Sequence, residues 1–351
     1  PGLRQNATDR SNLALQHAGT AAQGTITLRL TVFSGNPGSP SQTTLPDLTL
    51  NAGEFSQLTL VLQSQGLNLN NGFVKIDRIA GTAPYYAYGV INDSSNSDGS
   101  FIPAIPENAM TGRSGLSLPV IVEGAFTSEL VVTNWSTQQK VVRFTYVESS
   151  QASTATPTFS ATVNPSQQTI IPNIFQYLRS LNVPGVGPLG LTYVGALFAT
   201  VDGGDAGGIF VGARTSTPGG GGAFGLFYAA VPHSTASTGS AWLFGLQQNV
   251  ENRTNLALVN TGEEGNTPIT LSIDLYDGNT GAKVTTLTET LNARSWRQLG
   301  TVLTYASGVT QGYARVTRTS GSNPFIAYAV VNDGGQPNQR SGDGAFVTSA
   351  P

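Results

Sequence analysis

The chain contains no cysteine, so it can form neither a disulfide framework nor a thiolate metal site. Charged residues are also scarce, because 17 basic and 20 acidic side chains give a net charge of only −3 over 351 residues. This balance offers no electrostatic attraction to nucleic acid or to an acidic membrane surface. We therefore expect no nucleic-acid partner.

Long apolar runs are missing as well. No stretch approaches the roughly 20 residues that span a bilayer, so we expect no membrane insertion. Gly, Ser, Thr, Asn and Gln fill surface positions that Lys and Glu usually occupy, and a chain without cysteine remains compatible with export. The composition leaves a secreted, extracellular or cell-surface location open.

Histidine is nearly absent, with only His17 and His233 in the chain. They stand far apart in the sequence, in the turn-like contexts QHAG and VPHST, which predicts surface or turn histidines. A hydrolase needs a nucleophile and a base within reach of each other. The acids are scattered at turns rather than paired as glycoside cleavage requires. We expect the protein not to be an enzyme.

Four blocks of sequence from the N-terminal part of the chain recur in the same order in the C-terminal part. The matching blocks are GLRQNATDRSNLALQHAG (2–19) with GLQQNVENRTNLALVNTG (245–262), GFVKIDR (72–78) with GYARVTR (312–318), APYYAYGVINDSSNSDG (83–99) with NPFIAYAVVNDGG (323–335), and DGSFI (98–102) with DGAFV (343–347). Self-similarity of this kind is the signature of a repeat architecture.

A more diverged copy lies between them. Its blocks are FTSELVVTNWS (126–136), VVRFTYV (141–147) and GIFVGARTST followed by GAFGLFYAAVP (208–232). The sequence therefore predicts three units, 1–107, 108–232 and 233–351, here named the first, middle and third unit.

Alternating apolar and polar residues predict strands in every unit, as at 26–32, 142–146 and 269–275. One apolar triplet per unit instead has the i, i+3, i+4 spacing of a helix face: Leu58, Val61 and Leu62; Ile171, Ile174 and Phe175; Leu299, Val302 and Leu303. About seven or eight strands and one short helical turn in roughly 115 residues indicate an all-β chain of three tandem β-sandwich domains of immunoglobulin-like size.

The first unit lacks most of the strand with which the others begin. The middle unit starts with SGLSLPVIVEG (114–124) and the third with TGSAWLFGLQQN (238–249), whereas the first starts at Gly2, already inside the equivalent of GLQQN. Either the sequence begins late, or another chain or an upstream repeat supplies the strand by β-augmentation. Gly2 and Leu3 are therefore interface candidates.

Two further groups of residues suggest ligands. Asp93, Asn96 and Asp98 in NDSSNSDG have oxygen atoms at spacings that partly resemble a calcium loop, but the closing Glu is missing and an Asx-type turn explains them better. Calcium is the one cofactor candidate. The aromatic residues Tyr85 and Tyr86 offer flat faces for sugar rings, although alternate residues of a strand point into the core.

The pattern of NRSNLALxNxG, an alternating strand, a helical turn, GYxRVxRxSGxxPFxAYGVIND and a closing DGSF hairpin resembles tandem β-sandwich repeats of large secreted proteins of environmental bacteria. That family is functionally uncharacterised. The middle unit departs from the pattern, with GGDAGGIFVGARTST in place of the aromatic AYGVIND segment. The resemblance implies export and a repeat architecture, and it assigns no catalytic residue.

We therefore expect a non-catalytic extracellular structural protein, the subunit of a surface fibre, filament or stalk that assembles head to tail as a homopolymer, with strand complementation as one route. The alternative is an adhesin module that binds polysaccharide or a receptor through its aromatic hairpins.

Overall fold

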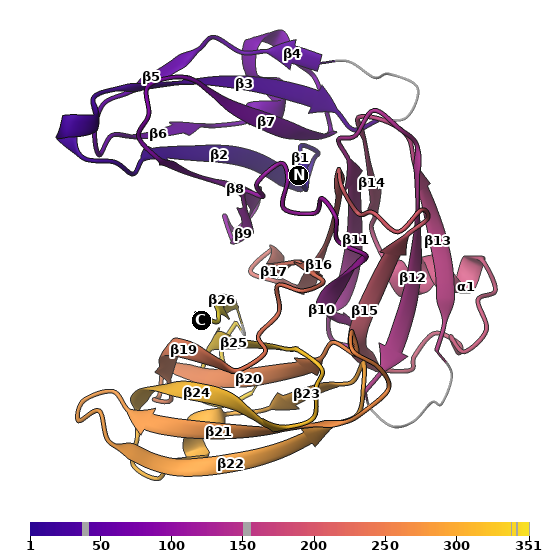
Figure 1. The fold of residues 1–351 in the computed structure, drawn as a ribbon, viewed down its shortest axis with the longest axis vertical. Helices are drawn as coiled ribbons and strands as arrows, with labels where there is room; N and C mark the ends of the chain where they lie inside the picture. Colours follow the sequence, from indigo (N-terminus) through magenta and orange to yellow (C-terminus); the bar gives the residue numbers. More distant parts are fainter. Residues whose placement is uncertain (37–41, 150–155, 338, 342, 351) are drawn as a thin grey trace.

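The computed structural model describes residues 1–36, 42–149, 156–337, 339–341 and 343–350. It is an all-β structure with 55% strand and 6% helix, arranged in five antiparallel sheets. This confirms the fold class expected from the sequence. Figure 1 shows the first and third units lying on opposite sides of a hairpin that the middle unit extends between them.

The first unit contains two sheets that face each other across a buried core. One sheet has the order β1-β7-β3-β4 with β5 also on β3, and the other has the order β6-β2-β8-β9. Their bounds are β1 (Leu3–Arg4), β2 (Asp9–His17), β3 (Ile26–Ser34), β4 (Gln42–Thr44), β5 (Leu48–Leu50), β6 (Phe55–Leu58), β7 (Asn71–Ala80), β8 (Tyr85–Asp93) and β9 (Gly99–Pro103).

The third unit repeats this plan with sheets of order β19-β24-β21-β22 and β23-β20-β25-β26. Their bounds are β19 (Ser240–Gln247), β20 (Asn252–Asn260), β21 (Ile269–Asp277), β22 (Lys283–Leu291), β23 (Trp296–Leu299), β24 (Gln311–Ser320), β25 (Phe325–Asp333) and β26 (Gly344–Thr348). Corresponding strands of the two units therefore occupy corresponding places, as their matching sequences predict.

The middle unit differs because its strands join into one sheet of order β13-β12-β15-β10-β11-β16-β17, with β14 on β11 and β18 on β10. The bounds are β10 (Gly115–Glu123), β11 (Thr127–Asn134), β12 (Lys140–Glu148), β13 (Thr158–Val163), β14 (Gln167–Ile171), β15 (Tyr193–Val201), β16 (Ile209–Gly219), β17 (Gly222–Ala229) and β18 (Val231–Pro232). The two halves connect through a single pair of residues, Glu123 and Thr127, at the turn between β10 and β11.

Each unit has the helical turn that its apolar triplet predicts: η2 (Val61–Gly66), α1 (Ile174–Ser180) and η3 (Val302–Tyr305). The second and third members of every triplet are buried residues of these turns, whereas the first member is the last residue of the preceding strand. A further 3₁₀ turn, η1 (Ala21–Gln23), was not predicted.

The cores continue across the boundaries between units. Val131, Phe210 and Phe227 of the middle unit belong to the core of the first unit, and Val259 and Tyr328 of the third unit belong to the core of the middle one. Because burial of apolar area is the main stabilising term in folding, these shared cores hold the three units in a fixed arrangement.

Candidate functional site

The first unit has an open strand position beside β7. In the third unit β19 pairs with β24 from Ser240–Thr317 to Gln247–Gln311, whereas β1 pairs with β7 only at Leu3–Gly72 and Arg4–Asn71. Beyond Gly72, the outer edge of β7 has no strand partner among the described residues. An exposed edge of this kind offers unpaired backbone groups to an incoming strand.

The structural alignment of the units is fixed by a bulge. The register of β19 shifts between Leu243 and Leu246, where Gly245 has φ +75°, and Gly2 has the same left-handed backbone with φ +81°. Leu3 is buried in its core as Leu246 is. Pro1 and Gly2 therefore correspond to the bulge, and the four-residue arm that precedes it in the third unit, Ser240–Leu243, has no counterpart among the described residues of the first.

A strand paired with β7 in the first unit would also have a neighbour on its other side. In the middle unit β10 lies between β15 and β18, with Ser117 opposite Val231, and in the third unit Trp242 exchanges two backbone hydrogen bonds with Ala350, both 2.8 Å. The first unit has the corresponding segment Ala104-Ile105-Pro106, which matches Ala230-Val231-Pro232. The open position is thus a two-sided gap between β7 and Ile105, which we call the strand slot.

The strand slot is an apolar cavity of about 380 Å³. Its walls include Val74, Ile76, Tyr85 and Ile105, and Trp135 of the middle unit closes one side. Val74 and Ile76 are partly exposed there, whereas the residues at the same positions of the other units are buried: Ala314, Val316, Leu197 and Ala199. The first unit therefore has core positions that nothing in the described chain covers.

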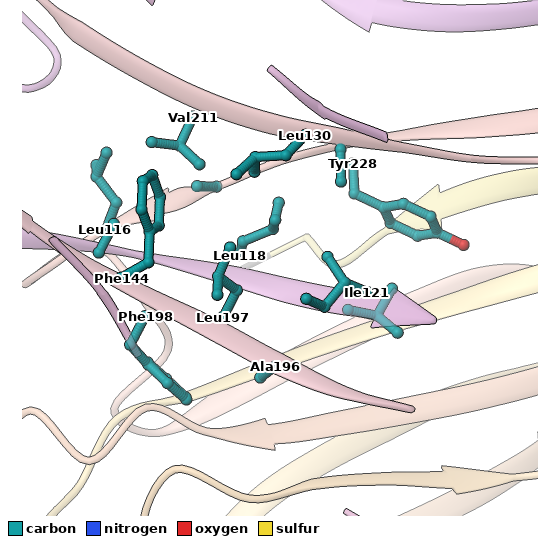
Figure 2. Close-up of a cluster of buried hydrophobic side chains, with 14 of the residues drawn as sticks. Leu116, Leu118, Ile121, Leu130, Phe144, Ala196, Leu197, Phe198, Val211 and Tyr228 are labelled. Atoms are coloured by element: carbon teal, nitrogen blue, oxygen red, sulfur yellow. The ribbon is translucent and has the colours of Figure 1, made fainter. Parts of the chain in front are cut away.

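Figure 2 shows what covers these positions in the middle unit. Leu116, Leu118 and Ile121, all from β10, point into the core on the same side as Leu197 and Leu130. In the third unit the equivalent side chains are Ala241, Leu243 and Leu246. Only the last of each set has a counterpart in the first unit, namely Leu3.

Polar groups line the mouth of the strand slot. The Lys75 ammonium lies 3.3 Å from Asp77 Oδ1 and 3.3 Å from Glu107 Oε1, so one ion pair crosses the gap. Burial lowers the pKa of Lys75, but the hydrogen bonds to Glu107 and Asp77 outweigh it and raise that pKa overall. The Tyr85 hydroxyl donates a 3.1 Å hydrogen bond to Ile76 O, and burial raises the Tyr85 pKa.

The structure brings three of the predicted interface residues together at this site. Leu3 and Tyr85 line the strand slot, and Gly2 lies at its end, where its amide donates to Gln168 Oε1 at 2.7 Å. Tyr86 lies outside and is 50% exposed. Sequence reasoning missed Val74, Lys75, Ile76 and Glu107. The repeated Ala-x-Pro of 104–106 and 230–232 was the available signal for the second edge.

The calcium candidates lie at the contact with the middle unit. Asp93 accepts hydrogen bonds from the amides of Ser95, Asn96 and Ala223, and Asp98 Oδ2 accepts from Gly225 N at 2.7 Å. Among the described residues no group of three His, Cys, Asp or Glu could hold a metal ion. One oxygen of each carboxylate thus binds a backbone amide of the β16–β17 hairpin, Asp93 also binds amides of its own loop, and calcium binding stays a prediction.

His233 lies in a turn, as expected, whereas His17 differs from the expected surface or turn residue. His17 is buried, with Nε2 2.9 Å from Gly24 O and Nδ1 accepting from Gly19 N at 3.1 Å, because both ring nitrogens are needed to satisfy the turn. His233 Nδ1 lies 3.2 Å from Ser114 Oγ, and burial lowers the His233 pKa. Ser114 and His233 line neither the strand slot nor the cavity between the middle and third units.

A second cavity, of about 500 Å³, lies between the middle and third units and is lined by Phe126, Trp296 and Tyr328 among others.

Within the described residues, no helix has the length and apolar character needed to cross a membrane.

No protein-family model and no curated protein matches the chain. Among solved structures, a glycosyl hydrolase family 2 member from Bacteroides cellulosilyticus is similar over 72% of this chain and 32% of that one, with 8% identity and a TM-score of 0.15. The chain thus spans about a third of that structure, and similarity at this level supports no conclusion about fold or function.

Proposed function

We propose that the protein is a non-catalytic structural subunit of an extracellular fibre or stalk, and that the strand slot accepts a β-strand from another polypeptide. A strand of one subunit in the slot of the next makes a head-to-tail contact. Repeating such a contact gives a filament when the subunits do not close into a ring. The observation that carries the proposal is the edge of β7 that no described residue pairs with, together with the apolar cavity between it and Ile105.

The physical argument is the cost of leaving the strand slot empty. The gap exposes Val74 and Ile76, which are core positions, together with an unpaired strand edge. An inserted strand would bury the apolar side chains and pair its backbone with β7, so affinity arises from both terms. The low charge and the Ser-, Thr- and Asn-rich composition support the extracellular location, as does the resemblance to secreted repeats.

Electron microscopy of the purified protein tests the proposal with two variants. Ile76→Arg places a charged side chain in the strand slot and should leave only unassembled subunits. Ile79→Arg is the matched control, since Ile79 lies on the same strand but is 44% exposed and does not line the slot. Filaments should persist in this control. Filaments of normal length from folded Ile76→Arg protein would show the proposal to be wrong.

A second candidate function is carbohydrate binding, favoured by an aromatic row on the first unit. Tyr86 and Phe101 are 50% and 44% exposed, and the ring of Tyr88 lies between them, with centroids 5.9 and 5.1 Å away. Flat exposed rings can stack on sugar faces. Binding on a glycan array that Tyr86→Ala abolishes and Tyr305→Ala preserves would support this alternative, since Tyr305 is equally exposed in the third unit.

A further inference from the structure

We infer that the strand slot selects one sequence pattern, a small residue, then an aromatic residue, then leucine, on a strand that runs antiparallel to β7. The inference rests on the proposed function and specifies the chemistry of the partner. The leucine follows from both units in which the same position is filled, whereas the aromatic residue follows from the third unit, since the middle unit has Ser117 there.

The register comes from those filled units. Leu118 lies opposite Leu197 and Leu243 opposite Ala314, and both of these β15 and β24 positions correspond to Val74. Leucine therefore occupies the position opposite Val74 in each known case. Because β1 continues the same strand past the bulge, the incoming strand runs in the direction of β1 and ends near Pro1.

The small residue follows from side-chain volumes. Leu116 lies opposite Ala199 in the middle unit, and Ala241 lies opposite Val316 in the third, so a larger partner on one strand accompanies a smaller one on the other. The corresponding residue of the first unit is Ile76, which is larger than either. Since interiors are close-packed, only alanine or glycine fits opposite it without displacing neighbours.

The aromatic residue follows from the opposite face of the sheet. In the third unit Trp242 packs against the stacked rings of Tyr276 and Tyr313, and the Arg315 guanidinium lies 5.4 Å from its ring. The first unit has the same stack in Phe33 and Phe73, with centroids 4.8 Å apart, and Lys75 stands in the place of Arg315.

Phe33, Phe73 and Lys75 all line the strand slot, so the aromatic platform and its cation are present while the tryptophan is missing. An inserted aromatic ring would stack on Phe73 and receive the Lys75 ammonium over its face, in place of the Glu107 ion pair. Backbone pairing with Ile105 completes the position, as Ser117 pairs with Val231 in the middle unit.

The test uses the intact protein and a capped synthetic peptide, TGSAWL, with the sequence of residues 238–243. We expect it to bind with a shift in tryptophan fluorescence. A peptide with Leu243→Asp should bind roughly 100-fold more weakly, because a carboxylate would enter the apolar cavity. A peptide with Ala241→Leu should bind at least about tenfold more weakly to the wild type, because it overfills the site opposite Ile76.

A compensating variant distinguishes sequence-selective binding of the peptide from non-specific apolar binding. The protein variant Ile76→Ala should accept the Ala241→Leu peptide better than the original peptide, since the removed volume is restored from the other side. A spin label on the peptide N-terminus should broaden amide signals near Asp77 and leave those near Leu3 unchanged, which tests the direction.

Three outcomes distinguish the inference from the proposed function. Selective binding with the compensation establishes the pattern, whether or not filaments form. Filaments that require Ile76, together with equal or absent binding of all peptides, would overturn the pattern and leave assembly standing. Neither filaments nor selective binding would overturn both.

Discussion

The carboxyl group of Asp343 in the third unit lies close enough to Asp98 of the first unit to add to the effect of burial and raise the Asp98 pKa, although the two residues occupy equivalent places in the two repeats. They meet beside β17 of the middle unit, where Gly225 N donates to Asp98 Oδ2. The adjoining rings of Tyr228 and Phe346 pack edge to face at 5.1 Å. The hairpin of the middle unit is thus held from both sides by the two outer repeats.

This carboxyl pair predicts a pH-dependent stability. Burial, together with the nearby Asp343, raises the pKa of Asp98 from 3.8 to about 6. Between about pH 4 and pH 6 the folded protein binds more protons than the unfolded chain, so stability falls as pH rises through this range. Because Asp98 is partly exposed, we expect a loss on the order of 1 kcal/mol.

Urea unfolding at pH 4.5 and pH 7.5 measures this loss, with Asp98→Asn as the comparison. The amide keeps an oxygen for Gly225 N and cannot ionise, so the variant should lose less stability between the two pH values than the wild type. Equal losses in both proteins would mean that the pair does not titrate as described.

A second prediction concerns Gln168, which is buried at the contact between the first and middle units. Its Oε1 accepts from Gly2 N and Thr133 Oγ1, and its Nε2 donates to Asn71 Oδ1 and Gly72 O. Gln168→Ala leaves several of these groups without a partner, so we expect a loss of about 3 kcal/mol in the free energy of unfolding.

Gln139 supplies the control for this experiment. It is exposed and makes a single side-chain bond, from Nε2 to Asn164 Oδ1 at 2.7 Å, so Gln139→Ala should change stability by less than about 0.5 kcal/mol. Limited proteolysis should cut Gln168→Ala protein faster at the boundary of the first unit. If both variants unfold at the wild-type urea concentration, Gln168 does not hold the contact.

The repeats made much of this fold predictable from sequence. Alternation located the strands, and comparison of the starts of the units showed that the described residues hold no counterpart of Ser240–Leu243 beside β7. Gln168 was not predictable, because its partners are distant in sequence and it belongs to no repeated motif. Asp93, Asn96 and Asp98 stay calcium candidates on sequence alone, because the residue types that bind calcium are also those that accept backbone amides in turns. The joining of the middle sheet depends on the single residue pair Glu123 and Thr127 at the turn between β10 and β11, which periodicity does not encode.

A third prediction separates backbone strain from steric clash at glycines. Gly81 and Gly321 end equivalent strands with φ +79° and +82°, and a Cβ there would lie 2.2 Å from Thr25 O and 2.4 Å from Pro268 O. We expect Gly81→Ala and Gly321→Ala each to cost about 3 kcal/mol or more, because both the backbone angle and the carbonyl contact oppose the methyl group.

Gly53 and Gly308 are matched controls, since their φ values are +74° and +81° and a Cβ would meet nothing within 4 Å. Alanine at either should cost only about 1 kcal/mol, the strain alone. Thermal unfolding of the four variants measures the difference. Equal losses in all of them would show that the carbonyl contacts relax freely.

The last prediction concerns Arg4 and Glu129, which form a two-fold hydrogen-bonded ion pair across the contact between the first and middle units. Their side chains are only 6% and 12% exposed. Burial raises the pKa of Glu129 even though Arg4 opposes that shift. Arg4→Met therefore leaves a buried carboxylate without its main partner and should cost about 3–5 kcal/mol at pH 7.

The double variant Arg4→Met with Glu129→Leu should recover most of that loss, because no buried charge is left unpaired. The single variant should also regain stability as the pH falls toward the unfolded pKa of glutamate, since Glu129 becomes neutral in the folded state first. A double-mutant cycle at pH 7 and pH 5 measures both effects. A coupling energy that does not shrink at pH 5 would mean that packing, rather than the unpaired charge, sets the cost of losing Arg4.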